Sequence, residues 1–136
     1  MRLVTAESED PGTGSDSIRG KEVPSDVILY RIEGPMFFAA AEKLDMALRG
    51  SGGKPRVVIF RMRNVPAMDA SGLHAFEGAI EKLRRDHVEI FLTAVQPQPM
   101  KVMFEAGLAE RIGLERFCAD IDQALAAATV RNSRDT

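Results

Sequence analysis

Three side chains that could take part in chemistry lie close together in the segment 64–74, namely Asp69, Ser71 and His74. A serine becomes a nucleophile only when a base removes its proton, and His74, three residues after Ser71, could lie near it on one helical turn. The Gly-x-Ser-x-Gly sequence of a nucleophile elbow is absent, because Asp69 and Ala70 precede the serine. We therefore expect no catalytic residues and no enzymatic activity.

Asp69 and Ser71 have two interpretations that the local sequence leaves open. A run typical of a buried strand, Val57–Phe60, precedes them and a helical pattern follows from Leu73, so they lie where a helix begins. Either residue could be the N-cap, which contributes about 1 kcal/mol over alanine. Alternatively, Ser71 presents its hydroxyl to a partner or accepts a phosphoryl group, which the helix N-terminus stabilises and the nearby acid opposes. That combination suits a regulatory switch.

Other side chains near this junction are candidates for contact with an anion or a partner protein. Arg61 and Arg63 lie two residues apart on one face of a strand, at the carboxyl end where α/β sheets bind ligands. Solvated or ion-paired arginines are the alternative at such a position. Of Phe37 and Phe38, at least one ring is expected to face the core, and the other could be a surface contact.

The residues that commonly bind metal ions are too scattered to form a metal site. The two histidines, His74 and His87, are separated by a predicted helix, and Cys118 is remote from both in sequence. His87 falls where that helix should end, and a histidine there interacts favourably with the helix dipole. The single cysteine also excludes an internal disulfide, which agrees with a reducing compartment. We therefore expect no bound metal.

Strand and helix patterns alternate on both sides of the junction. Apolar patterning predicts strands at 27–32, 57–62 and 88–95, and helices at 36–49, 73–86, 98–106 and after Asp120. Shorter strands are expected at 117–118 and, as an edge strand, at 1–5. The middle connections are long enough for right-handed crossovers. This order predicts a small α/β domain in which helices pack against a mainly parallel sheet.

Length and composition restrict the class of protein. The 136 residues fit one domain spanning 1–136, with a core over about 26–130, a loop or linker over 6–25 and a frayed tail over 131–136. The formal charge of −2 comes from 18 basic and 20 acidic residues without a basic stripe, which disfavours a nucleic-acid partner. No apolar run approaches the roughly 20 residues that span a bilayer, and residues 1–5 are followed by acids and turn residues in place of the apolar core of a signal peptide. We expect a soluble, cytoplasmic domain, which could be the soluble part of a longer membrane protein.

Three segments of the chain together resemble a known family. They are Tyr30–Leu44 with its Gly-Pro-Met-Phe-Phe sequence, Arg61–Leu73 with its Asp-Ala-Ser-Gly sequence, and Val95–Gln98 followed by Ala106–Leu108. In this order they resemble the STAS domain at the C-terminus of SulP-type sulfate permeases, over about residues 26–128. The resemblance implies the STAS, or anti-sigma factor antagonist-like, fold: a mixed, mostly parallel sheet of 4–5 strands with about four helices mainly on one side.

The same resemblance implies a non-catalytic regulatory domain at the cytoplasmic face of an anion transporter. Such a domain modulates transport, assembly or trafficking through protein contacts at the Asp69–Ser71 loop. Its partners are the membrane domain of the same polypeptide and cytoplasmic regulatory proteins, and a homodimer through the transporter is compatible with this role. The domain itself does not insert into the membrane. In the related antagonists the serine matching Ser71 is the phosphorylated switch, and Asp69, Ala70 and Gly72 complete the signature loop.

The resemblance also leaves a second function open, that of a free-standing anti-sigma factor antagonist switched by phosphorylation of Ser71. No cofactor is implied beyond weak nucleotide binding near the loop. Arg61, Arg63, Phe38 and His74 are then the candidate contacts for a nucleotide, another anion or a partner protein.

Overall fold

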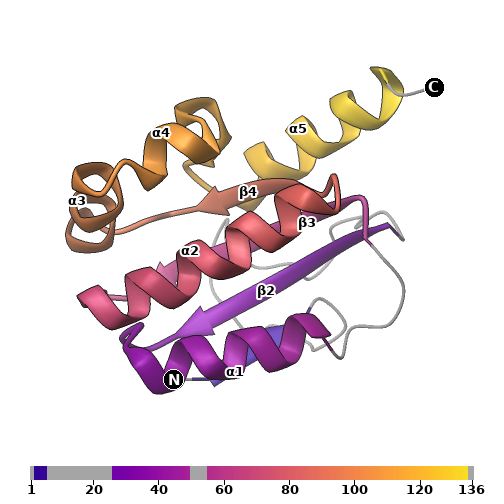
Figure 1. Ribbon diagram of the computed structural model, residues 1–136. Coiled ribbons are helices and arrows are strands. Elements are labelled where there is room, and N and C mark those ends of the chain that lie inside the picture. Colours follow the sequence, from indigo (N-terminus) through magenta and orange to yellow (C-terminus); the bar gives the residue numbers. More distant parts are fainter. Residues whose placement is uncertain (1, 6–25, 50–54, 135–136) are drawn as a thin grey trace.

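The computed structural model describes residues 2–5, 26–49 and 55–134, which form a sheet with helices on both faces (Figure 1). Within these ranges the strands are β1 (Arg2–Thr5), β2 (Val27–Glu33), β3 (Val57–Asn64), β4 (Glu89–Thr93) and β5 (Phe117–Cys118). They lie side by side in chain order. Strand β1 is antiparallel to β2, and the other neighbours are parallel. The carboxyl ends of β2 to β5 therefore meet at one edge of the sheet.

The helices are divided unequally between the two faces. One face packs against α1 (Phe38–Arg49), α2 (Ala70–Arg85), α3 (Pro97–Glu105) and α4 (Leu108–Ile112), and the other packs against α5 (Ile121–Arg134). Figure 1 shows α1 and α2 in front of the strands. The predicted STAS-type architecture, a mixed and mostly parallel sheet with helices mainly on one side, is confirmed.

The alternation of side chains along β3 divides the core into two clusters. Phe60 and Met62 pack under α1 to α4 together with Tyr30 and Phe76, and the ring centroids of Phe60 and Phe76 are 5.2 Å apart. Val57 and Ile59 point to the other face, where they pack against α5. Because β3 is covered on both faces, its apolar run is continuous, as expected of a central parallel strand.

Two helical segments differ from the sequence prediction. Helix α2 begins at Ala70, three residues before the predicted start, because Asp69 caps it. The region 107–116, expected to be a turn, contains α4 and the 3-10 helix η2 (Leu114–Arg116). These elements are 5 and 3 residues long, too short for a helical period to be recognised. The predicted linker at 6–25 lies outside the described residues.

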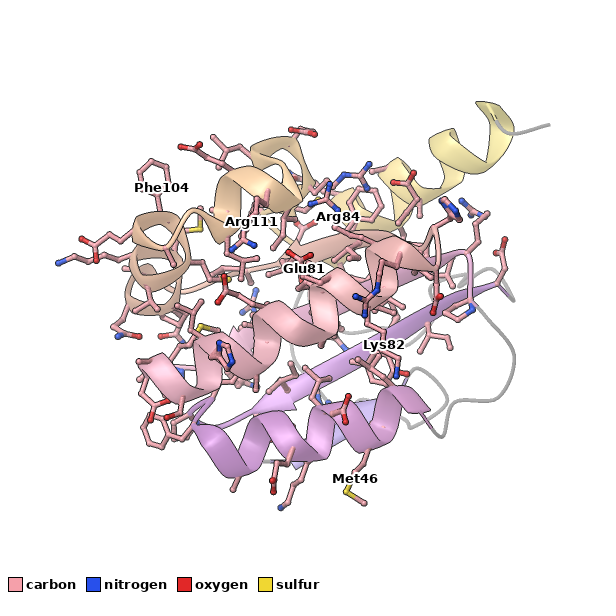
Figure 2. The ribbon with its side chains drawn as sticks, viewed as in Figure 1. Met46, Glu81, Lys82, Arg84, Phe104 and Arg111 are labelled. Carbon is pink, nitrogen blue, oxygen red and sulfur yellow. The ribbon has the colours of Figure 1, made fainter. Side chains whose placement is uncertain are left out.

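Helix α4 is tied to α2 by charged side chains. Arg111 of α4 pairs with Glu81 at 2.9 Å and with Glu77, and Arg84 donates to the carbonyl of Arg111 at 2.5 Å. Figure 2 shows Glu81 and Arg111 lying between the two helices. In the described ranges, none of the helices has both the length and the apolar character needed to cross a bilayer.

Candidate functional site

The loop between β3 and α2 is held by the connection between β2 and α1. The backbone N–H of Met36 donates to the carbonyl of Ala67 at 2.8 Å, and the N–H of Asp69 donates to the carbonyl of Met36 at 3.4 Å. Met36 and Met68 form a parallel β-bridge, and both side chains are buried. The loop thus continues the pairing of β2 with β3, so its backbone is positioned by the sheet.

Gly72, in the first turn of α2, packs directly on the same connection. A Cβ atom at this position would lie 1.9 Å from the carbonyl oxygen of Met36 and 3.2 Å from Oδ1 of Asp69. The nearest atom belongs to the backbone, which cannot rotate away as the end of a side chain can. Glycine is therefore required here by the close approach of two backbone segments.

Asp69 is the N-cap of α2. Its Oδ1 accepts a hydrogen bond from the N–H of Gly72 at 2.7 Å, and its carbonyl accepts one from the N–H of Leu73 at 2.8 Å. Ser71 is exposed in the first turn, and its hydroxyl has no hydrogen-bond partner among the described residues. Because Asp69 satisfies the cap, the side chain of Ser71 is not needed to start the helix and can contact a partner.

The side-chain amide of Gln98, at the start of α3, holds the middle of the loop. Its Oε1 accepts from the N–H of Met68 at 2.8 Å, and its Nε2 donates to the carbonyl of Met68 at 3.2 Å. Gln96 holds the backbone at the end of β3, because its Nε2 donates to the carbonyl of Arg63 at 2.7 Å. The two amides supply partners for backbone groups that have left the strand ladder.

Neither glutamine was predicted to have a role, although both lie in the segment 95–98 that contributed to the family resemblance. The sequence gives only a weak indication of this role. Two amide side chains, two residues apart, come directly after a strand that ends at the same edge of the sheet as β3. Each glutamine lies more than 29 positions along the chain from the backbone group that it holds, so their partners could not be identified from spacing.

One of the predicted contact residues, His74, lies near Ser71, and Phe37, the neighbour of the predicted Phe38, is exposed at the connection that holds the loop. His74 is exposed one turn further along α2. Phe37 follows Met36 directly and is 45% exposed, so an aromatic side chain lies beside the start of α2. The side chain of Phe38 lies outside the described residues. Ser71, His74 and Phe37 form the surface that we call the loop face.

Arg61 and Arg63 have different environments. Arg61 is 3% exposed, and the alternation of β3 directs it to the α5 face together with Ile59. Arg63 is exposed at the end of the strand. Because α2 covers the opposite face of the sheet, Arg61 points away from Ser71.

Cys118 on β5 also lies apart from the loop face. Burial, and then the negative charge of Asp120, raise the pKa of its thiol, so the thiol stays protonated at neutral pH. A protonated thiol is a poor nucleophile and a poor metal ligand. His87 lies beyond the other end of α2, with a positive φ of 62°. The structure thus separates Cys118 and His87 from the residues near Ser71.

Comparisons with known proteins show what this arrangement is similar to. The family model described as the STAS domain matches residues 20–124. YvdB of Bacillus subtilis, a candidate sulfate transporter, is 31% identical over 98 residues, which make up 71% of this chain and 18% of the relative. The chain spans less than a fifth of the length of the curated relatives that it matches, at 18% and 16%.

Two solved structures share the fold over most of their length. A sulfate transporter family protein from Wolinella succinogenes is 35% identical with a TM-score of 0.80, covering 87% of this chain and 97% of that one. The STAS domain of a SulP transporter from Vibrio cholerae is 25% identical with a TM-score of 0.73, covering 85% of this chain and 91% of that one.

Proposed function

This chain belongs to the STAS domain family, and from that membership we propose that it is the non-catalytic regulatory domain of a SulP-type sulfate or anion transporter. It acts at the cytoplasmic face of the membrane, where the membrane domain of the same polypeptide is its principal partner. The sulfate transporter names of the matching relatives support this proposal, as does the small share of their length that the chain covers. The proposed role needs no bound cofactor.

The observation that carries the proposal is the exposed hydroxyl of Ser71 on a loop whose backbone is positioned by hydrogen bonds. Met36, Gln98 and the Asp69 cap position the loop without using the serine. A binding site gains affinity and specificity when it is preorganised in this way. The absence of a hydrogen-bonded base among the described residues supports a role for Ser71 in contact and not in nucleophilic attack.

Phosphorylation of Ser71 would change this surface strongly. A phosphoryl group adds about −1.5 to −2 charges at neutral pH. The phosphoryl group would lie two residues from Asp69, whose carboxylate already accepts a hydrogen bond from the N–H of Gly72. The two anionic groups would then compete for the same helix N-terminus, so modification would weaken the cap and alter docking at the loop face. We propose that this competition is the regulatory switch.

A functional assay tests the role of the loop. In the full-length transporter, Ser71→Glu is expected to change anion uptake or assembly more than it destabilises the domain, since weakening of the cap costs about 1 kcal/mol at most. Ala126→Glu is the matched control, because it adds the same charge at an exposed position of α5 on the other face of the sheet. Equal uptake by the two variants would contradict regulation through Ser71.

The reading frame upstream of Met1 tests the assignment to a transporter. About ten or more hydrophobic segments in that frame are expected. A stop codon directly upstream, together with stoichiometric phosphate on Ser71 after incubation with a kinase-type partner, would instead indicate the free-standing anti-sigma factor antagonist.

A further inference from the structure

Three exposed prolines lie at the carboxyl edge of the sheet. Pro35 follows β2, Pro66 follows β3 and Pro97 follows β4. Because β3 lies between β2 and β4, the loop of Pro66 lies between the other two. A proline has no backbone N–H and a fixed φ, so each presents an apolar ring on a stiff backbone. We call Pro35, Pro66 and Pro97 the proline ridge.

Hydrogen bonds on both sides of the outer prolines attach them to the central loop. The residues before and after Pro35 donate their N–H groups to the carbonyls of Asn64 and Ala67, each at 2.8 Å. The glutamines before and after Pro97 make the contacts with the same loop that are described above. Pro66 lies within the segment that all four residues hold, so the ridge is one surface and not three separate loop tips.

The loop face adjoins the ridge. Phe37 follows Pro35 by two residues and is 45% exposed. Ser71 directly precedes Gly72, which packs against the carbonyl of Met36. The end of a strand is a common place for a proline, which explains each member of the ridge singly, but it does not explain an exposed aromatic ring beside them. Adjoining exposed apolar side chains mark a surface for contact with another protein.

The direction of β1 places the entry to the domain at the same edge. Strand β1 is antiparallel to β2, with Arg2 opposite Glu33 and Thr5 opposite Tyr30. The first residue of β1 therefore lies at the carboxyl end of β2, next to the ridge. Figure 1 shows the arrowhead of β2 at the same end of the molecule as the start of α1. In a longer protein, a segment that precedes β1 would reach the domain at this edge.

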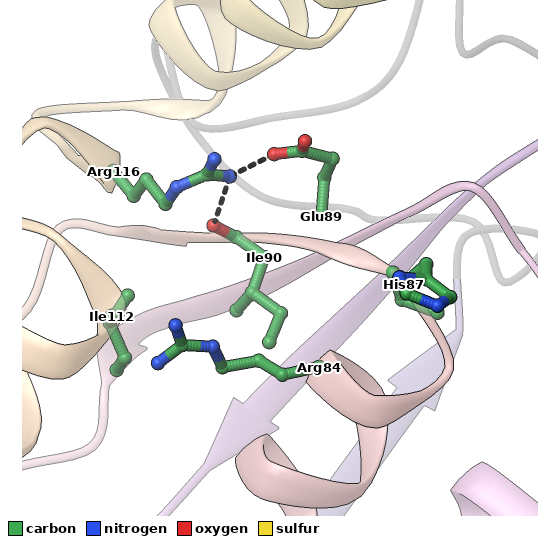
Figure 3. Close-up of a pocket in the computed structure, with 7 residues that line it drawn as sticks. Arg84, His87, Glu89, Ile90, Ile112 and Arg116 are labelled. Carbon is green, nitrogen blue, oxygen red and sulfur yellow. Dashed lines mark hydrogen bonds and ion pairs between the residues drawn. The ribbon is translucent and has the colours of Figure 1, made fainter.

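The amino edge of the sheet has a different character. Arg56, directly before β3, donates through Nη2 to the carbonyl of Ala128 at 3.4 Å, so α5 runs toward this edge. A cleft of about 290 Å³ lies here, at the start of β4 (Figure 3). Arg84 and Arg116 line it, and Arg116 forms an ion pair with Glu89. Charged residues are depleted from the buried centres of protein interfaces, so this edge is less suited to docking than the ridge.

We propose, on the basis of the function proposed above, that the proline ridge and Phe37 dock on the membrane domain of the same polypeptide. The carboxyl edge of the sheet then faces the membrane, and the amino edge faces away from it. The membrane domain precedes this domain in such a transporter, so the segment that leads into β1 brings it to the ridge. The chain makes up 18% of the length of the relative from Bacillus subtilis, so most of such a polypeptide lies outside it.

The chemistry of the ridge defines the surface that it fits. The prolines offer no N–H donors, so the partner surface is expected to be apolar where it covers them. Their fixed backbone loses little conformational freedom on docking, which favours affinity. Ser71 lies at the margin of this contact, where a phosphoryl group would introduce charge beside an apolar interface. Docking at the ridge thus gives the proposed switch a place to act.

Cysteine labelling tests which face is covered. Pro66→Cys is expected to react with a maleimide at least about tenfold more slowly in the full-length transporter than in the 136-residue chain, because the membrane domain covers it. Ala126→Cys, at an exposed position of α5, should react within about twofold at the same rate in both. Mass spectrometry of peptides separates these labels from any on Cys118. Equal rates for Pro66→Cys, or equal slowing of both variants, would overturn the proposal.

A charge placed beside the ridge tests its role in transport. Phe37→Arg is expected to lower anion uptake by the full-length transporter at least about fivefold, since the charge would be buried without a partner. Met46→Arg is the matched control, because Met46 is 70% exposed on α1 and its side chain points away from α2 (Figure 2). Thermal melts of both variants of the 136-residue chain verify folding. Equal uptake by the two variants would contradict docking at the ridge.

Two outcomes separate the docking proposal from the assignment to a transporter. An upstream reading frame without a membrane domain would contradict both. A transporter whose uptake responds to Ser71→Glu, but in which Pro66→Cys reacts as fast as in the isolated chain, would contradict only docking at the ridge.

Discussion

The two ends of α2 are built in different ways. At its start, backbone atoms position the helix: Gly72 lies against the carbonyl of Met36, and the pairing of Met36 with Met68 continues the sheet. In its second half, next to the buried Ile80 and Leu83, long side chains also connect it to α4, through the contacts of Arg111 with Glu77 and Glu81. The side chains of Glu81 and Arg111 are 52% and 42% exposed.

This difference agrees with the proposed role of the loop face. Backbone contacts between buried segments cannot rearrange without moving the sheet, so the backbone at Ser71 is held in one position. Exposed ion pairs are weak and screened by salt, so the charged contacts between α2 and α4 contribute less to stability.

Gly72→Ala should have the largest effect on stability and tests the backbone contact. The new methyl group would overlap the carbonyl of Met36, so the free energy of unfolding is expected to fall by about 3 kcal/mol in urea titrations. Gly78→Ala is the matched control, because a Cβ there meets nothing within 4 Å. It should raise the free energy of unfolding by about 0.5–1 kcal/mol through helix propensity. Similar losses in both variants would mean that the approach to Met36 is not what requires glycine.

Gln98→Ala should have the second largest effect. It removes both hydrogen bonds to the backbone of Met68, so a loss of about 1–2 kcal/mol is expected, together with faster hydrogen exchange of the Met68 amide. Lys101→Ala, an exposed change on the same helix, should cost less than about 0.5 kcal/mol. Unchanged exchange at Met68 would show that the amide does not hold the loop.

Asp69→Ala tests whether the capping role belongs to Asp69 and not to Ser71, the proposed contact residue. Loss of the N-cap should cost about 1 kcal/mol, and Asp69→Asn should recover most of it by keeping an acceptor for Gly72. Ser71→Ala should change the free energy of unfolding by less than about 0.5 kcal/mol. A larger loss in Ser71→Ala than in Asp69→Ala would make the serine a structural residue.

Glu81→Gln should have the smallest effect and tests the other end of α2. The exposed pair with Arg111 is expected to contribute about 0.5 kcal/mol or less, and even this difference from the parent chain should disappear in about 1 M salt. The effect of Gly72→Ala should persist at the same salt concentration, because it is steric. If the salt dependences of the two variants were alike, the two ends of α2 would not differ in the way described.

Much of the fold follows from patterns within single segments. The continuous apolar run of β3 predicted a central strand, and the turn residues and helical spacing predicted α1 and α3 within one or two residues. Asp120 was predicted to cap the last helix, and its Oδ1 accepts from the N–H of Gln123 at 3.0 Å. These features are local, because a strand or a helix start depends on residues that are neighbours in sequence.

The candidate site was predicted only in part. The position of Asp69 and Ser71 at a helix start could be read from the sequence, but the division of roles between them could not. Both residue types are good N-caps, so local propensity is similar for the two. The capping geometry decided that Asp69 holds the helix and that Ser71 is exposed.

By itself, the sequence determined the order of strands and helices, the family resemblance and the segment in which the loop lies. The tertiary structure decided why Gly72 must be glycine, what Gln98 holds, that Arg61 is buried while Arg63 is exposed, and that Arg84 and Arg116 face one cleft. Most of these features depend on contacts between residues about 30 or more positions apart in the chain. Such contacts leave no periodic trace in the sequence, since only the packed sheet brings the partners together.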